Sequence, residues 1–273
     1  MAAYYNEIDP YAADWLRRLI ATKVIPAGDV DERSITDVRP DDLRGYRQCH
    51  FFAGIGGWPL ALRLAGWGDE WRVWTGSVPC QPYSVASVGH GGAEGQSDDR
   101  HLWPTFSALI REHRPPAIFG EQVASAVKWG WWDEVALDLE SQGYAAVSAI
   151  LRADAYGAAH ERKRLYWVAH AGREGWEGHQ PITRIPESEA APLPEHGDPL
   201  AGARRALDGD LSHLLPCDGL SVVVERAALK GYGNAIVPPV GAAFVKAYLA
   251  AFYEFPSNGG GPKPEPHAEG HSE

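Results

Sequence analysis

The chain has 273 residues, of which 45% are hydrophobic, and this length allows one large α/β domain with a substantial core. A net charge of −11 has the wrong sign for a protein held on nucleic acid by its overall field, although a local positive groove can coexist with it. The three cysteines are scattered, which argues against a disulfide framework and against a zinc site. The chain has no long apolar run and no apolar leader, so we expect a cytoplasmic protein with no membrane span. No cluster of metal ligands appears in the sequence, so we also expect no metal.

Strand and helix patterns alternate along most of the chain, which predicts an α/β fold with a mostly parallel sheet and helices on both faces. In chain order, strands are predicted within 2–9, 24–32, 48–57, 73–80, 116–123, 145–157, 165–170 and 221–224, and helices at 10–23, within 33–46, and at 58–67, 101–114, 131–144 and 241–252.

Two stretches break this alternation. Residues 85–100 are rich in Gly, Ser and Asp without periodicity, which predicts a mobile loop. Residues 172–217 are dense in Pro, Gly, His and charge, which predicts a small loop-rich insertion. We therefore divide the chain into a main domain at 1–171, this insertion, a return to the main domain at 218–255, and a disordered tail at 256–273.

The block Phe51–Gly57 ends a predicted strand and opens a helix, where backbone N–H groups can meet a cofactor. By itself this signal is weak, because many glycine-rich turns are only tight turns. Cys80 ends the predicted strand 73–80 and stands at the carboxyl edge of the sheet, where backbone dipoles and a cationic neighbour would favour a reactive thiolate. The alternative is a buried structural cysteine, which we prefer for Cys49 and Cys217.

Glu121 ends an apolar strand, where a carboxylate is costly unless it is paired or functional, and a raised pKa would suit it to general-acid work. A helix-capping role is the alternative. Arg162 and Arg164 precede the strand 165–170, and the strand alternation places both on one side. Two guanidinium groups there suit a phosphate or a carbonyl oxygen, whereas a solvated charge run is the simpler explanation.

These blocks appear in a familiar order. FFAGIGGWPLAL, GSVPCQPYS, FGEQV, HERKRLYWVA and GYGNAIVPPVGAAF, between residue 51 and about residue 245, resemble the signature blocks of cytosine-5 DNA methyltransferases. The resemblance implies a Rossmann-like methyltransferase sheet, S-adenosyl-L-methionine as cofactor, double-stranded DNA as partner, and a bacterial or phage-infected cell as location. It also makes 1–171 the catalytic and cofactor-binding domain and 172–217 the target-recognition segment.

The resemblance further implies roles for single residues. Cys80 attacks C6 of a flipped cytosine, Glu121 holds the ring N3 and amino group, Arg164 supports the O2 side with Arg162 beside it, and the loop after Ser84 closes over the base. It assigns the remaining site residues to the cofactor (Phe52, Ala53, Gly54, Ile55, Gly56, Pro79, Asn234, Ala235) and to DNA (Gln81, Ser84, Ser87, Arg100).

Two cofactor-binding acids of the family are missing from the short interval between the glycine block and the Pro-Cys block. Residues 6–12 resemble the ribose block and 28–30 the adenine block, which predicts permuted first strands with Glu7, Ile8 and Asp29 at the cofactor. Since βαβ crossovers are nearly always right-handed, the helix 58–67 should then cover the face of the sheet opposite its usual one.

Smaller departures affect the substrate. Gln122 stands where the family usually has Asn, which predicts looser hydrogen bonding at that strand end, and His160 stands where Gln is common. The recognition segment is short, and residues 152–205 carry eight basic and eight acidic residues, so recognition is weak, damaged, or dependent on a partner protein. A tRNA cytosine-5 methyltransferase and a non-catalytic homologue stay open as alternatives. So does the purpose, whether restriction-modification, phage-genome protection or regulation.

Overall fold

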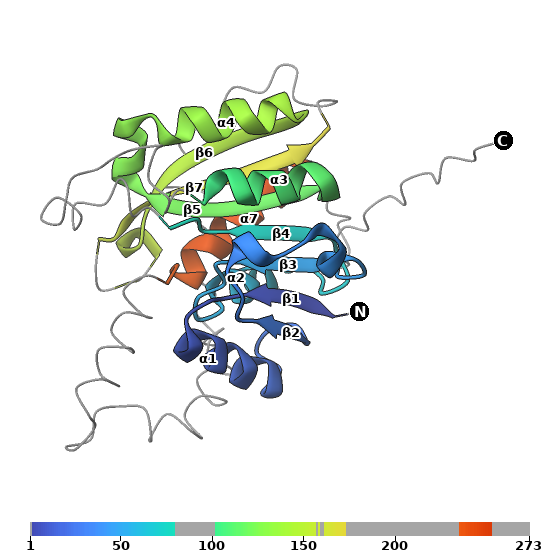
Figure 1. The fold of residues 1–273 in the computed structure, drawn as a ribbon. Coiled ribbons are helices and arrows are strands. Elements are labelled where there is room, and N and C mark those ends of the chain that lie inside the picture. The colour runs from blue at the N-terminus through green and yellow to red at the C-terminus, as the bar shows by residue number, and fades with distance from the viewer. Residues whose placement is uncertain (1, 80–101, 157, 159–160, 173–234, 253–273) are drawn as a thin grey trace, which may run out of the picture.

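The computed structural model describes residues 2–79, 102–156, 158, 161–172 and 235–252 (Figure 1). The predictions for 85–100, for most of the insertion at 172–217, for the strand 221–224 and for the tail lie outside these residues. Within the described part, strands and helices alternate as predicted (β1 Ala3–Asn6, α1 Pro10–Ala21, β2 Gly28–Asp31, β3 Gln48–Phe51, α2 Gly57–Ala65, β4 Val73–Gly76, α3 Trp103–His113, β5 Ala117–Val123, α4 Trp131–Ser141, β6 Tyr144–Arg152, β7 Lys163–Ala171, α7 Pro238–Phe252).

Local sequence signals explain where the helices begin and end. The Asp9 side chain accepts hydrogen bonds from the backbone N–H groups of Tyr11 and Ala12, so it caps α1, and Pro10 occupies the first turn. α2 ends at Gly66, which adopts the left-handed conformation that favours glycine. The segment 33–46, predicted to be partly helical, forms only two short 3-10 helices, η1 (Ile35–Asp37) and η2 (Pro40–Leu43), since Pro40 interrupts it.

The seven strands form one sheet in the order β2-β1-β3-β4-β5-β7-β6. β2, β1, β3, β4 and β5 run parallel to one another, and β7 runs antiparallel between β5 and β6. The predicted α/β class with a mostly parallel sheet is therefore confirmed. The two N-terminal strands lie outside β3, which carries the glycine block, and this is the spatial order that permuted first strands require.

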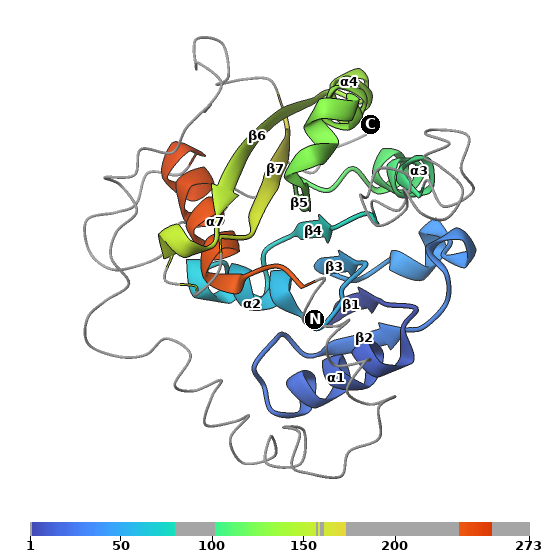
Figure 2. The same cartoon turned by 90° about the vertical axis from the view of Figure 1, so that its left-hand side faces the viewer.

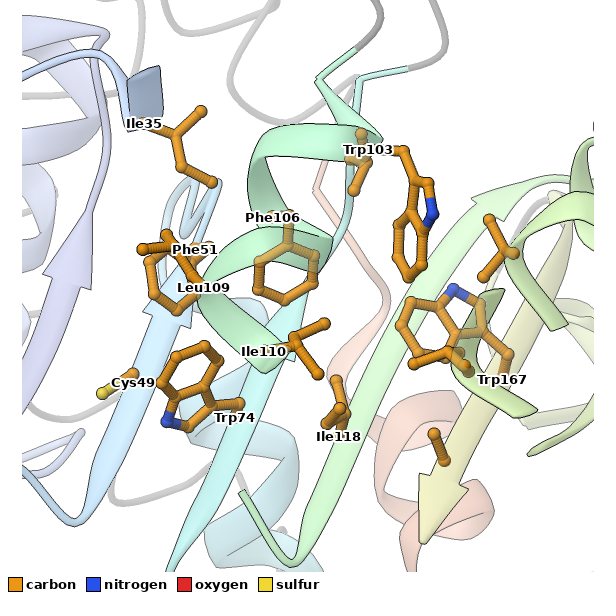
Figure 3. Packing of buried hydrophobic residues seen from close by; sticks show 14 of the residues in the cluster. Ile35, Cys49, Phe51, Trp74, Trp103, Phe106, Leu109, Ile110, Ile118 and Trp167 are labelled. Atoms are coloured by element: carbon orange, nitrogen blue, oxygen red, sulfur yellow. The ribbon is translucent and has the colours of Figure 1, made fainter. Parts of the chain in front are cut away.

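Helices cover both faces of the sheet (Figure 2). On one face, which we call the α1 face, α1 packs on β1, and α2 and α7 pack on β4 and β5. The other face, which we call the α3 face, is covered by α3, α4, η1 and η2. Its core is rich in aromatic side chains, among them Phe51, Trp74, Phe106 and Trp167 (Figure 3). Both faces of the sheet are thus covered by packed helices, as expected for a mainly parallel sheet.

The prediction that a right-handed crossover moves α2 to the opposite face of the sheet is wrong. The connection from β1 to β2 runs toward the β2 edge of the sheet and crosses the α1 face. The connections from β2 to β3, from β4 to β5 and from β5 to β6 run toward the opposite edge and cross the α3 face. Because direction and face change together, all of these crossovers have the same hand. The step from β3 to β4 moves with the second group but uses the α1 face. The crossover through α2 therefore has the opposite, rare left hand.

Close glycine packing explains this exception. A Cβ on Gly57 would lie 2.5 Å from Cγ1 of Ile236, and one on Gly56 would lie 3.0 Å from Cδ1 of Leu19. These approaches seat the start of α2 between α1 and the segment that leads into α7. These contacts hold α2 on the α1 face, although the crossover to β4 is then left-handed.

A buried polar row crosses the α1 face of the sheet. The ring of Tyr5 stacks on His50 with centroids 5.1 Å apart, and His50 Nδ1 lies 2.9 Å from Thr75 Oγ1. Complete burial lowers the pKa of His50 to about 3. The imidazole is consequently neutral in the folded protein at any pH at which the protein is handled.

We expect His50 to make the protein acid-sensitive. Below the ordinary histidine pKa of about 6.5 the unfolded chain takes up a proton that the folded chain does not, so this contribution to stability is present above pH 6.5 and is lost on acidification. Between pH 7 and pH 5 the wild type should lose about 2 kcal/mol more unfolding free energy than His50→Gln, which cannot titrate. Urea unfolding at the two pH values measures the difference. Equal losses in both proteins would contradict this.

Candidate active site at the carboxyl edge of the sheet

The carboxyl ends of the parallel strands meet at one edge of the sheet. The register places Asn6, Asp31, Phe51 and Gly76 in one row at the ends of β1, β2, β3 and β4. The residues that follow these strands, and the end of β5, are therefore brought together although they are far apart in sequence. Ligands of open α/β sheets bind at such an edge.

The glycine block forms the turn between β3 and α2. Phe52, Gly54 and Gly56 have positive φ angles of 50°, 55° and 82°, and Gly56 caps the start of α2. A Cβ on Gly54 would meet no atom within 4 Å, so the backbone at this residue faces open space. Ala53 and Ile55 pack against the buried apolar side chains of α1 and β1. The turn thus combines a helix N-terminus, a rigid backbone and room beside it, which suits a bound cofactor.

Glu7 follows β1 and reaches this turn. The Gly54 N–H donates to Glu7 Oε2 at 2.7 Å, and the Asp9 N–H donates to Glu7 Oε1 at 2.9 Å. The neighbouring Ile8 is 64% exposed, so its side chain is accessible to a ligand beside the turn. Glu7 is thus fixed beside the glycine turn, whereas its contact and that of Ile8 with a cofactor stay predictions.

Asp29 is placed differently from Glu7. It lies two residues before the carboxyl end of β2, roughly 7 Å along the strand, and its carboxylate accepts a hydrogen bond of 2.7 Å from the Tyr46 hydroxyl. Asp31 ends the strand instead and pairs with Arg33 and with the Tyr4 hydroxyl. These two aspartates and their three partners line one cavity of about 440 Å³ (Tyr4, Asp29, Asp31, Arg33, Tyr46). The contact of Asp29 with an adenine stays a prediction, and sequence reasoning missed Asp31.

Glu121 is buried at the end of β5 and has cationic neighbours. Its Oε1 atom lies 2.9 Å from Arg164 Nε in an ion pair, and the charge of Arg162 also acts on it. Arg162 donates to the Ala235 carbonyl at 2.7 Å. Burial raises the pKa of Glu121 to about 7, even though both arginines oppose the shift. The carboxyl can therefore hold or release a proton near neutral pH.

Gln122 links this strand to the segment that precedes Cys80. Its amide Nε2 donates to the Val78 carbonyl at 3.0 Å, and its Oε1 accepts from the Val123 N–H at 2.9 Å. Both ends of the amide are therefore satisfied and the side chain is buried. The prediction that Gln122 loosens the hydrogen bonding at this strand end is wrong, because the longer side chain still reaches the neighbouring backbone.

Most of the predicted site residues that the structure describes lie near the carboxyl edge of the sheet. They follow β1, β3 or β4, lie near the end of β5, or lie at the start of β7 and beside it (Glu7, Ile8, the turn 52–56, Pro79, Glu121, Arg162, Arg164, Ala235). Asp29 lies inside β2 instead. The other predicted site residues lie outside the described residues (Cys80, Gln81, Ser84, Ser87, Arg100, Asn234). Within the described ranges there is no group of three or more His, Cys, Asp or Glu side chains that could hold a metal ion. None of the helices in this part is long and apolar enough to cross a membrane.

Comparison with known proteins agrees with this constellation. Residues 68–199 match the family model described as C-5 cytosine-specific DNA methylase. The chain is 24% identical over 171 residues to the type II methyltransferase M.HhaI of Haemophilus parahaemolyticus, and the aligned part covers 48% of this chain and 51% of that protein. It thus spans about half the length of this relative.

Two solved structures are also similar. DNMT2 of Spodoptera frugiperda has 14% identity and a TM-score of 0.41, with 68% of this chain and 56% of that chain covered. The methyltransferase EhMeth of Entamoeba histolytica has 12% identity and a TM-score of 0.47, with 93% of this chain and 99% of that chain covered. The strand order, with β7 antiparallel, and the glycine turn define a Rossmann-like methyltransferase fold. Residues 68–199 therefore carry a C-5 cytosine-specific DNA methylase domain.

Proposed function

We propose that this protein transfers a methyl group to C5 of a cytosine in double-stranded DNA, with Cys80 as the covalent nucleophile. The main support is the buried Glu121–Arg164 pair, whose carboxyl has a pKa of about 7 and which Gln122 ties to the segment that leads to Cys80. A carboxyl that is half protonated at neutral pH can act as an acid toward a ring nitrogen.

The glycine turn fits S-adenosyl-L-methionine. The open space at Gly54, the N-terminus of α2 and the adjacent Glu7 carboxylate suit a nucleoside with hydroxyl groups, and the exposed Ile8 suits the face of an aromatic base. When bound there, the cofactor supplies an electrophilic methyl group. The division into domains at 1–171, 172–217, 218–255 and 256–273 is part of the same proposal.

The residues of the chain divide the chemistry between them. The Cys80 thiolate adds to C6 of an extruded cytosine while protonated Glu121 donates toward N3, and this addition makes C5 nucleophilic. Arg164 holds the Glu121 carboxyl in place and faces the O2 side of the ring with Arg162. After transfer, C5 loses its proton to solvent, Cys80 leaves C6 as the thiolate, and N3 returns its proton to the Glu121 carboxylate, so the aromatic ring and the enzyme are both restored.

Labelling experiments separate the substrate classes. Purified protein is incubated with tritiated S-adenosyl-L-methionine and, separately, with mixed-sequence duplex DNA and total tRNA, and the labelled base is identified after digestion. The proposal expects 5-methylcytosine from DNA. Label in tRNA alone would assign the protein to the RNA branch of the family, and label in neither would reject the proposal and favour a non-catalytic homologue.

The cofactor site can be tested by a matched pair of glycine substitutions. Gly54 and Gly66 both have positive φ, and a Cβ at either meets no atom within 4 Å. Each change to alanine should cost about 1 kcal/mol of stability, because L side chains avoid this conformation. Only Gly54→Ala should weaken S-adenosyl-L-methionine binding, by about tenfold, because its methyl group enters the proposed site. Calorimetric titration measures both affinities, and equal affinities would place the cofactor elsewhere.

A further inference from the structure

Trp58 lies in the first turn of α2, two residues after Gly56, and is almost fully buried. Its ring packs edge-on against Tyr166 of β7, with centroids 6.0 Å apart, and lies 5.9 Å from the ring of Phe119 of β5. Its indole Nε1 donates a hydrogen bond of 3.0 Å to Ser77 Oγ. One side chain thus joins the glycine turn to β5, β7 and the segment that follows β4.

The partner of Trp58 occupies a sensitive place in the chain. Ser77 and Val78 are the residues between the end of β4 and Pro79, which directly precedes Cys80. Gln122 holds Val78 by its carbonyl, and Trp58 holds Ser77 by its hydroxyl. Two side chains from different elements therefore fix consecutive residues of this segment, one on the side of β5 and one on the side of the glycine turn.

We propose that Trp58 is a positioning residue, which sets the approach of the segment 77–79, immediately before Cys80, to the cofactor turn through its hydrogen bond to Ser77. The inference rests on the proposed function. Because α2 starts at the glycine turn and carries Trp58 in its first turn, the indole holds the two halves of the site at a fixed separation. Transfer between bound groups depends steeply on their separation, so this bond should affect kcat and leave the affinities for the two substrates alone.

The chain offers a matched control. Trp67 is also buried on the α1 face and packs edge-on against Phe119, with centroids 5.8 Å apart, but its indole donates to the backbone carbonyl of Trp71. Trp67→Phe therefore removes the same atoms from the same cluster without touching Ser77. The test variants are Trp58→Phe and Ser77→Ala, which remove the donor and the acceptor, and Ser77→Thr, which keeps the hydroxyl.

Two measurements are made on the full-length proteins. Hydrogen exchange followed by mass spectrometry of the peptide 73–79 reports on the restraint itself and requires no activity. We expect exchange about five- to tenfold faster in Trp58→Phe and Ser77→Ala, the loss corresponding to one hydrogen bond, and no change in Trp67→Phe or Ser77→Thr. In DNA methylation assays kcat should fall by a similar factor in the first two variants, with KM for DNA and Kd for S-adenosyl-L-methionine within about twofold.

The double variant Trp58→Phe/Ser77→Ala should be no worse than either single variant, because both remove the same bond. Unchanged exchange in Trp58→Phe, or a fall in kcat as large in Trp67→Phe, would overturn the inference. Faster exchange without a change in kcat would overturn it as well. If the wild type methylates neither DNA nor tRNA, the proposed function fails, whereas the exchange measurement still decides whether Trp58 restrains Ser77.

Discussion

Replacement of Cys80 by alanine is expected to reduce methyl transfer by at least about 10⁴-fold, because C5 of cytosine is a poor nucleophile until a thiolate has added to C6. The variant should still bind S-adenosyl-L-methionine, since the glycine turn and Glu7 are untouched. It should still bind DNA too, since the thiol contributes little to affinity. Single-turnover transfer of a tritiated methyl group measures the loss.

Cys49→Ala provides the matched control for Cys80→Ala. Cys49 is fully buried in β3, and burial raises the pKa of its thiol well above the usual range, so it is an inert core residue. This control should lose stability by creating a small cavity and keep its transfer rate per folded molecule. Retained transfer in Cys80→Ala, or an equal loss in Cys49→Ala, would remove the assigned nucleophile.

Glu121→Gln is expected to lower kcat by about 10²- to 10³-fold, the usual contribution of a positioned general acid. The pH dependence makes the prediction specific. Because the pKa of Glu121 is raised to about 7, its proton persists up to neutral pH and is lost above it. If the protonated form is the active one, the wild-type kcat should fall tenfold per pH unit above about pH 7, and the variant should not show this decline.

Arg164→Met serves as a second probe of the same group. Arg164 lowers the pKa of Glu121, so its removal should raise that pKa and move the decline to higher pH, whatever happens to the absolute rate. Asp133→Asn, an exposed carboxylate in the first turn of α4, is the control and should leave the profile unchanged. A basic limb that survives in Glu121→Gln would assign the titrating group to another residue.

Much of the described fold was predictable from local patterns. Apolar residues at helical spacing in α1, together with the cap at Asp9, mark that helix without any tertiary information. The order of the motif blocks likewise predicted permuted first strands, and in the sheet β1 and β2 lie outside β3, the strand of the glycine block. Such predictions succeed because periodicity and motif identity are local properties of the chain.

The candidate site was predicted less evenly. Glu121 could be found because a carboxylate at the end of an apolar strand is costly without a function. Glu7 and the two arginines could be found because their sequence blocks resemble those of the family. Trp58 could not be found in this way, since a tryptophan on an apolar helix face looks like any core residue. Its hydrogen bond to Ser77 exists only because α2 and β4 pack together.

The sequence by itself therefore determined the strands, the helices, their order and the charged residues at the carboxyl edge of the sheet. The tertiary structure decided which face of the sheet α2 covers and how the Gln122 amide is hydrogen-bonded. It also decided that Asp31 lies at the carboxyl end of β2, whereas Asp29 lies within the strand. These features depend on close contacts between distant segments, such as Gly57 against Ile236. A crossover follows its preferred hand only when packing permits, and here the packing of α2 outweighs that preference.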